Sequence, residues 1–341
     1  MIIQLEKDIL EKVKEQTLKL IKAEGYSITE VKTQLGEYLV CLSKNDSDIR
    51  KMGNLPGVAD VHRVSDSYKL VSAKWKLNNS SITVDGLTIG GGADFTLMAG
   101  PCAIENEEQV TAIAKHLQAN GVRVMRGGIF KPRSSPYSFQ GLGAPGLEMF
   151  HRVCKAHNLK IISEVMETAQ IDQMHDYVDI FQVGARNAQN FNLLHALGKT
   201  DKPVLLKRGI SGTIDELLQS AEYIFSSGNE KILLCERGIR TFETASRNTF
   251  DINAISILKT KSHLPVIADP SHGIGIRAHV PAIALASLMA GADACIFEVH
   301  EKPEEAYSDG QQTLNFAESE SLIKKLNKLH QFKKTELAGA M

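Results

Sequence analysis

The 341-residue sequence predicts a (β/α)8 TIM barrel preceded by a small ferredoxin-like α+β domain. Three observations favour this fold class. From residue 95 onward, eight apolar, strand-like runs alternate with helical segments. Each run ends in charged, polar or glycine-rich residues, as barrel strands do where they meet an active site. The first 65 residues instead follow the order β-α-β-β-α-β of a split βαβ unit.

The small domain is expected to occupy residues 1–65. Its long helix has apolar residues at helical spacing, and Gly25 follows it as a C-cap. The expected elements are strands at Met1–Leu5, Ser27–Gln34, Tyr38–Ser43 and Gly57–Val64, and helices at Ile9–Ala23 and Asp46–Met52. Residues 66–93 are interpreted as a linker and a β-hairpin, ITVDGLTIGGG, that closes the bottom of the barrel.

The barrel is expected to occupy residues 94–334. Its eight strands are predicted within Phe95–Ala103, Val122–Phe130, Lys160–Val165, Ile180–Ala185, Pro203–Gly209, Lys231–Gly238, Leu264–Ser271 and Ala294–His300. The amphipathic segment Glu318–Phe332 is expected to form the last helix. A doubly wound open sheet is disfavoured, because no glycine-rich fingerprint follows the first of these strands.

Composition narrows the class of protein. The formal net charge is −1, which gives no reason to expect a nucleic-acid or membrane partner. The five cysteines are widely spaced and odd in number, so a disulfide framework is not expected. The N-terminus is charged within its first residues, unlike a signal peptide, and no apolar run is long enough to span a bilayer. We expect a cytoplasmic protein.

A metal site is predicted where the first, seventh and eighth barrel strands lie side by side. Cys102 ends the first strand, His272 follows the seventh, Glu298 lies near the end of the eighth, and Asp309 is in the loop after it. One sulfur, one nitrogen and two oxygen ligands suit Mn, Fe, Co or Zn. From spacing alone, His300 remains a rival to His272. A lone buried cysteine is more often a small hydrophobic residue, whereas a buried carboxylate such as Glu298 needs a partner.

An anion-binding mouth is the second prediction. Basic residues cluster at the strand ends, at Arg126, Lys131, Arg133, Arg186, Lys207, Arg208, Arg237 and Arg240. The acidic neighbours, mainly Glu164 and Glu236, are too few to neutralise them, so more than one phosphate or carboxylate is expected to bind. A solvated basic rim is the simpler alternative. Lys207 leaves a third possibility open, a Schiff base as in covalent aldolases.

The order of motifs resembles that of the 3-deoxy-D-arabino-heptulosonate 7-phosphate (DAHP) synthase family. The family type is the short one, related to 3-deoxy-D-manno-octulosonate 8-phosphate synthase. The resemblance runs from about Tyr68 to Phe316 and is carried by AGPCAIE, RGGIFKPRSSPYSFQGLG, QVGARNAQNF, PVLLKRG, ILLCERGIRTFE, DPSHGIG, and EVH followed by SDGQQ.

The resemblance implies a role for each matching residue. The divalent metal is implied to bind Cys102, His272, Glu298 and Asp309, which disfavours both His300 as a ligand and the Schiff base. Phosphoenolpyruvate is implied to bind Arg126, Lys131, Glu164, Arg186, Lys207 and Arg237. The aldose phosphate is implied to bind Arg133 and Ser134. Lys131, Cys102 and His272 are implied to act directly in catalysis, with Lys131 donating a proton to the aldehyde oxygen.

The implied reaction condenses phosphoenolpyruvate with erythrose 4-phosphate, at the entry to the shikimate pathway. Pro132, between Lys131 and Arg133, favours this four-carbon aldose, whereas octulosonate synthases, which use arabinose 5-phosphate, tend to have Asn there. Family likeness further implies a homotetramer, and feedback inhibition by Tyr or Phe through an ACT-like front domain. An oligomerisation module and a non-catalytic amino-acid sensor remain the alternatives.

Overall fold

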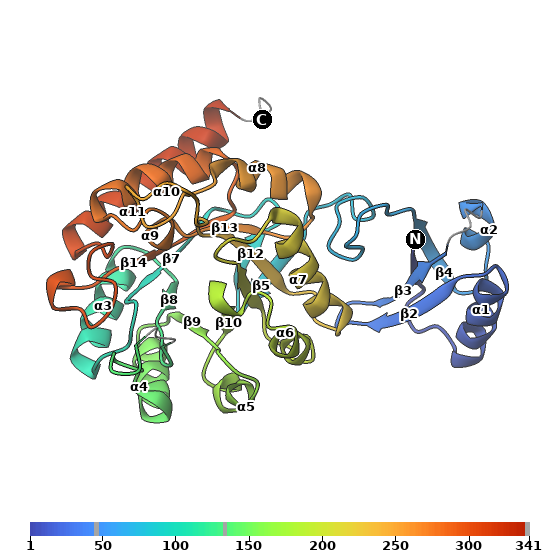
Figure 1. Cartoon of the computed structure of the whole chain (residues 1–341), viewed down its shortest axis with the longest axis horizontal. Helices are drawn as coiled ribbons and strands as arrows, with labels where there is room; N and C mark the ends of the chain where they lie inside the picture. The colour runs from blue at the N-terminus through green and yellow to red at the C-terminus, as the bar shows by residue number, and fades with distance from the viewer. Residues whose placement is uncertain (44–47, 132–134, 338–341) are drawn as a thin grey trace.

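The computed structural model describes residues 1–43, 48–131 and 135–337. In these residues, eight parallel strands close into a barrel in the order β10-β11-β12-β13-β14-β7-β8-β9, which confirms the predicted fold class (Figure 1). The barrel strands are β7 (Thr96–Gly100), β8 (Val124–Arg126), β9 (Lys160–Glu164), β10 (Ile180–Val183), β11 (Val204–Lys207), β12 (Ile232–Glu236), β13 (Val266–Ala268) and β14 (Ala294–Glu298). Their residues are buried throughout, as expected for parallel strands covered by helices on the outside.

Helices surround the barrel and separate its strands (Figure 1). They are α3 (Glu107–Ala119), α4 (Gly143–Ala156), α5 (Ala169–His175), α6 (Phe191–Leu197), α7 (Ile214–Ser226), α8 (Ile252–Lys261), α9 (Pro270–Ile274), α10 (Val280–Met289) and α11 (Phe316–Glu336), with 3-10 turns at η1 (Ala185–Asn187), η2 (Arg277–His279) and η3 (Pro303–Glu305). The last helix begins two residues earlier than expected, because Asn315 and Glu318 form a capping box. Among the described helices, none is both long and apolar enough to cross a membrane.

A two-stranded hairpin, β5 (Ser81–Val84) and β6 (Leu87–Gly90), lies under the N-terminal ends of the barrel strands. Its four inward side chains, Ile82, Val84, Leu87 and Ile89, share one buried cluster with residues of the barrel interior such as Met98 and Ile267. Asp85 at the hairpin tip pairs with Lys160, the first residue of β9. The hairpin therefore plugs the bottom of the barrel, which leaves the opposite mouth open for a site.

The front of the chain forms a separate antiparallel sheet in the order β2-β3-β1-β4 (Figure 1). Its elements are β1 (Ile2–Leu5), α1 (Glu11–Ala23), β2 (Ser27–Lys32), β3 (Glu37–Leu42), α2 (Ile49–Gly53) and β4 (Val58–His62). Both helices cover one face, where Ile21 and Met52 pack on Ile3 and Leu39. The other face, through Val31 and Tyr38, joins the hydrophobic core of the barrel.

The segment expected to be a linker is packed rather than loose. Tyr68, Leu70 and Trp75 are buried, and the Trp75 ring makes an edge contact with Phe225 of α7, 6.5 Å between ring centroids. The half-buried carboxylate of Glu222 accepts the backbone N–H groups of Leu70 and Val71 at 2.9 and 3.1 Å. Sequence periodicity missed this packing because the segment forms no long helix or strand.

Candidate active site

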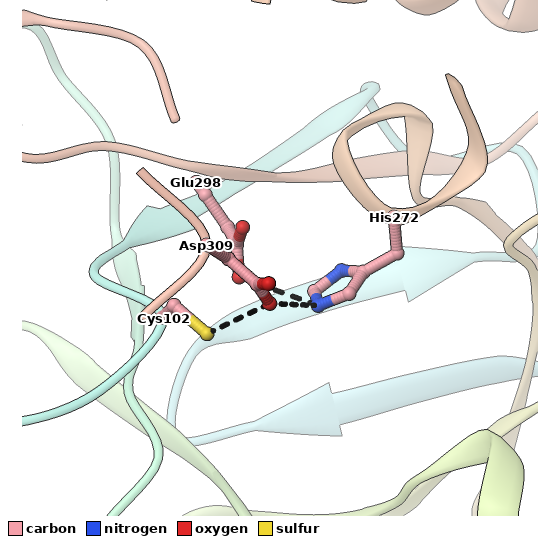
Figure 2. Close-up of side chains that lie close together, drawn as sticks. All are labelled: Cys102, His272, Glu298 and Asp309. Atoms are coloured by element: carbon pink, nitrogen blue, oxygen red, sulfur yellow. Dashed lines mark hydrogen bonds and ion pairs between the residues drawn. The ribbon is translucent and has the colours of Figure 1, made fainter. Parts of the chain in front are cut away.

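Four side chains with metal-binding atoms converge at the barrel mouth (Figure 2). Cys102, His272, Glu298 and Asp309 each offer one ligand atom, and these atoms lie within 4.8 Å of one another. Cys102 follows β7, His272 is in α9, Glu298 ends β14, and Asp309 lies in the loop before α11. The strands β13, β14 and β7 are neighbours in the barrel, so the convergence follows from their order.

Local backbone structure holds two of these residues. Asp269 caps α9, accepting the backbone N–H of His272 at 3.0 Å, and Pro270 occupies the first helical position. This cap sets the start of the turn that carries His272. Asp309 has a φ of 55°, in the left-handed region that Asp tolerates better than most residues. The next residue must be small, because a Cβ at Gly310 would lie 2.1 Å from the carbonyl oxygen of Pro303.

Burial and neighbouring charges shift the pKa values of three of the four groups. Burial, followed by the neighbouring Glu298, raises the pKa of the Cys102 thiol to about 11. Burial lowers the pKa of His272 against the pull of Asp269 and Glu298. Burial acts to raise the pKa of Asp309, but His272 and Arg247 outweigh it and bring the value to about 2. Cys102 thus contributes a protonated thiol, His272 a neutral imidazole and Asp309 an ionised carboxylate.

These donors fit a borderline divalent ion. A neutral imidazole is the form that binds metal, and a bound cation lowers the pKa of a coordinating thiol. The Nε2 atom of His272 lies 3.3 Å from Glu298 Oε1 and 3.8 Å from Asp309 Oδ2, so the ring presents this nitrogen to the two carboxylates. Asp269 Oδ2 lies 2.8 Å from the other ring nitrogen. A carboxylate on the far side of a ligating histidine is a common feature of metal sites.

A cavity of about 370 Å³ opens beside this group. The described basic residues that line it are Arg126, Lys131, Arg186, Lys207, Arg237, Arg240 and Arg247. Only Glu164 and Asp309 contribute carboxylates among the described lining residues. Seven cations against two carboxylates favour an anionic ligand, and 370 Å³ is the size of a small-molecule site.

The basic residues at the strand ends have more acidic partners than the sequence suggested. Arg126 lies 2.7 Å from Glu298 Oε1, and Lys207 lies 2.5 Å from Asp269 Oδ2. Arg208 was wrongly assigned to the mouth. It follows the end of β11, pairs with Glu236 and Asp251 at 2.8 and 2.9 Å, and does not line the cavity.

Lys131 lies between the cavity and the four-residue group. Its Nζ donates to the backbone carbonyl of Cys102 at 2.9 Å and lies 3.1 Å from the Cys102 sulfur. Its side chain is buried, and it lines the same cavity as Arg186 and Arg237. An ammonium here can reach a substrate atom that faces the four-residue group.

His300 is not part of the group. Its Nδ1 accepts the backbone N–H of Lys302 at 3.0 Å, and its Nε2 is directed toward Glu105, 3.6 Å away. β14 ends at Glu298, so strand alternation does not bring His300 to the side of Glu298. The structure therefore brings His272, rather than His300, to the other three residues.

Two predicted residues, Arg133 and Ser134, lie outside the described residues, as does Pro132. Glu164 lines the cavity at the end of β9. Sequence reasoning missed Asp269, Arg247 and Gln312, which contact the four-residue group. For Asp269 a signal existed, because Asp-Pro before a short polar stretch is typical of a helix start.

A protein-family model described as the DAHP synthetase I family matches residues 72–335. A phospho-2-dehydro-3-deoxyheptonate aldolase from Thermotoga maritima is 47% identical over 279 residues, which cover 82% of each chain. A 2-dehydro-3-deoxyphosphooctonate aldolase from a Geobacter species is 31% identical, over 73% of this chain and 96% of the relative.

Solved structures give the same likeness. The crystal structure of the Thermotoga maritima phospho-2-dehydro-3-deoxyheptonate aldolase (DAHP synthase) has a TM-score of 0.77 and 41% identity, with 97% of both chains covered. A truncated form of the Thermotoga maritima 3-deoxy-D-arabino-heptulosonate 7-phosphate synthase has a TM-score of 0.73 and 43% identity, covering 78% of this chain and 97% of that one.

Proposed function

The chain belongs to the DAHP synthetase I family, and from this premise we propose that it is a metal-dependent DAHP synthase. It condenses phosphoenolpyruvate with erythrose 4-phosphate and water to give 3-deoxy-D-arabino-heptulosonate 7-phosphate and phosphate. This is the entry reaction of the shikimate pathway to the aromatic amino acids.

One observation carries the proposal: the four-residue group and the cationic cavity share a boundary. Lys131 lines the cavity and contacts Cys102, and Arg126 lines it and contacts Glu298. Two phosphorylated substrates require several cations, and joining their carbons requires an activated carbonyl. The site combines both requirements in one mouth.

Cys102, His272, Glu298 and Asp309 would hold the divalent ion. When bound there, the ion supplies Lewis-acid polarisation of the aldehyde carbonyl. The donor set allows Mn, Fe, Co or Zn. Metal affinity falls at low pH, because His272 and the Cys102 thiol must give up protons to bind it.

The other residues bind and orient the substrates. Arg126, Arg186, Lys207 and Arg237 surround the cavity and stabilise the charge of phosphoenolpyruvate throughout the reaction. C3 of phosphoenolpyruvate forms a bond to the aldehyde carbon, and Lys131 donates a proton to the aldehyde oxygen as it becomes a hydroxyl. Water adds at C2, and phosphate leaves by cleavage of the C–O bond. Arg133 and Ser134 bind the phosphate of the aldose.

The proposal is tested by measuring phosphate release with both substrates and metal present, and again with each of the three left out in turn. We expect release only when phosphoenolpyruvate, erythrose 4-phosphate and a divalent metal are all present. Chelation with EDTA removes the activity, and Cys102→Ala abolishes it without unfolding the chain. An unchanged rate in EDTA would contradict the metal proposal, and phosphate release without erythrose 4-phosphate would contradict the condensation.

The acceptor sugar separates this function from the octulosonate synthases. The heptonate relative is 47% identical, against 31% for the octonate relative, which favours the four-carbon aldose. We expect a higher kcat/KM with erythrose 4-phosphate than with arabinose 5-phosphate. The reverse preference would assign the chain to the octulosonate branch. Any turnover excludes the non-catalytic sensor.

We infer that the front sheet mediates feedback inhibition by Tyr or Phe. Its β2–β3 turn is joined to the barrel, where Thr33 Oγ1 donates to Glu230 Oε1 at 2.5 Å and Gln34 Nε2 donates to the carbonyl of Thr200 at 3.1 Å. A titration of Tyr or Phe should inhibit the full chain and leave a chain that starts near Tyr68 unaffected. Equal inhibition of both would exclude gating. The homotetramer, and an oligomerisation role for the front sheet, stay predictions that sedimentation can test.

A further inference from the structure

A buried amide lies directly behind one of the four converging residues. Gln312 is fully buried, and its Nε2 donates to Glu298 Oε2 at 2.6 Å. Its Oε1 accepts a hydrogen bond from Arg247 Nη1 at 2.6 Å. Only this orientation of the amide satisfies both charged neighbours, because the carboxylate can only accept and the guanidinium can only donate. Gln312 itself does not line the described cavity.

The Arg247 side chain also reaches a second residue of the group. The same Nη1 lies 3.2 Å from Asp309 Oδ1. Arg247 and Asn248 belong to the long loop between β12 and α8, which is bound to the turn that carries His272. The Arg247 N–H donates to the carbonyl of Ile274 at 3.1 Å, and Asn248 Nδ2 donates to the carbonyl of His272 at 2.9 Å.

The close fit of this loop requires a glycine beneath it. A Cβ at Gly275 would lie 2.3 Å from the Cβ of Arg247, and Gly275 also has a φ of 69°. The backbone of Arg247 therefore rests directly on the C-terminal end of α9. The loop thus contacts His272 through Asn248 and Asp309 through Arg247, and Gln312 links Arg247 to Glu298.

We propose that Gln312 and Arg247 are positioning residues that orient Glu298 and Asp309 for metal binding. Gln312 occupies Oε2 of Glu298, which leaves Oε1 directed toward His272 Nε2 at 3.3 Å. Arg247 holds the amide of Gln312 in place and fixes Asp309 directly. Without these bonds, Arg126 still holds Oε1 of Glu298, but Oε2 of Glu298 and Oδ1 of Asp309 lose their partners, and binding the metal has to restrain both carboxylates further. The inference rests on the proposed metal site.

Hydrogen bonds to charged acceptors are among the stronger ones in proteins, and they are strongest when buried. Groups that orient metal ligands contribute about 10- to 100-fold to metal affinity. We therefore expect Gln312→Met, which keeps the size and removes both hydrogen bonds, to weaken metal binding by about that factor. Arg247→Met should weaken it as well.

The test measures metal affinity, not activity. Cobalt(II) is titrated into the metal-free full-length protein, and binding is followed by the sulfur-to-cobalt absorption band of the Cys102 thiolate. Gln311→Met is the matched control, because Gln311 is the exposed neighbour in the same turn and its side chain makes no hydrogen bond to the described residues. Circular dichroism checks that each variant is folded, and Arg247→Met, on a partly exposed side chain, carries the test if Gln312→Met does not fold.

The double variant tests whether the two residues act together. If Arg247 works through Gln312, the loss in the double variant is well below the product of the two single losses. If the fold-loss of cobalt affinity in the double variant equals the product of the two single losses, Arg247 does not act through Gln312. Parent-like cobalt affinity in Gln312→Met, or an equal loss in Gln311→Met, would overturn the role of Gln312. A parent protein without the cobalt band would instead contradict the metal site itself.

Discussion

Arg126 Nη1 donates to Glu298 Oε1 at 2.7 Å, with both side chains buried. Glu298 thereby belongs to the four-residue group while it balances a cation of the substrate cavity. Burial opposes the charge of Arg126, but Glu298 raises the pKa of the guanidinium above its usual value. The four-residue group and the cationic cavity are therefore electrostatically coupled, so a change of charge in one alters the other.

The coupling predicts a large stability effect for Glu298→Gln. The substitution keeps the shape and leaves the Arg126 guanidinium buried without its carboxylate. Removing one partner of a buried ion pair costs about 3–5 kcal/mol. We expect a loss of that order in the unfolding free energy of the metal-free protein, measured by denaturant titration in EDTA.

The control for this prediction is Glu304→Gln. Glu304 pairs with Arg277 at 2.8 Å, but its side chain is 71% exposed, so solvent screens the pair. We expect no measurable change in the denaturation midpoint of this variant. If Glu298→Gln has the same denaturation midpoint as the control, the buried charge of Arg126 does not need Glu298 for stability.

A second prediction concerns Asp269, whose carboxylate serves two partners. Its Oδ2 lies 2.5 Å from Lys207 Nζ and 2.8 Å from His272 Nδ1. Asp269→Asn keeps the helix cap, since Asn caps as well as Asp, but removes the negative charge. We expect metal affinity and turnover to fall about 10- to 100-fold, because the ligating ring loses its orienting carboxylate.

Asp251→Asn provides the comparison for Asp269. Asp251 also caps a helix, α8, and also faces a buried cation, Arg208, but it does not contact the four-residue group. Metal titration of both variants separates the effects. Unaltered metal binding in Asp269→Asn would rule out its orienting role.

Much of the site could be predicted because barrel topology brings strand ends together. Cys102 and Glu298 were predicted from their places at the ends of β7 and β14, which are neighbours in the barrel, and Asp309 was predicted from the loop that follows β14. The same rule failed at Arg208, which directly follows Lys207. Arg208 lies beyond the end of β11, and its guanidinium pairs with Glu236 and Asp251 instead of lining the cavity, which the position of a cation after an apolar run does not reveal.

The part that the β12–α8 loop plays in the site could not be predicted. Arg247 lies in the long β12–α8 loop, and its contact with Asp309 depends on how that loop folds over Gly275. Hydrophobic periodicity carries no information about such a path. For the same reason, the burial of Trp75 and Leu70 against the barrel was not anticipated, since their segment is neither a long helix nor a strand.

A third prediction tests the wall of the cavity at Gly184. An added Cβ would lie 2.0 Å from Oε1 and 2.9 Å from Cδ of Glu164, while the backbone φ of −70° accepts alanine. Gly184→Ala therefore displaces the carboxylate of Glu164. Misplacing a group by about 1 Å in such a site costs up to about 100-fold in rate. We expect a loss of this order in kcat/KM for phosphoenolpyruvate.

Gly209→Ala is the matched control. Gly209 follows β11 at the same mouth, but the nearest atom to an added Cβ is 3.6 Å away, which is ordinary contact. We expect steady-state kinetics close to those of the parent. Equal losses at both positions would mean that Gly184 matters for a reason other than its contact with Glu164.

The last prediction concerns pH and the bottom of the barrel. His263 is buried, with Nδ1 2.8 Å from Ser80 Oγ and Nε2 2.8 Å from the carbonyl of Leu70. The ring is satisfied in its neutral form, with Nε2 donating and Nδ1 accepting. Burial lowers its pKa to about 4 from the usual 6.5.

Because the pKa of His263 is lower in the folded state, the unfolded chain binds more protons between pH 6.5 and 4. The unfolding free energy therefore falls as the pH falls through this window, by up to about 3 kcal/mol from this residue. His263→Gln should lower stability at neutral pH and flatten this slope. His279→Asn, at an exposed histidine, should keep the parent slope. Denaturant unfolding at a series of pH values gives the unfolding free energy of the parent and both variants. If this free energy depends on pH equally in His263→Gln and in the parent, His263 is not the source of the slope.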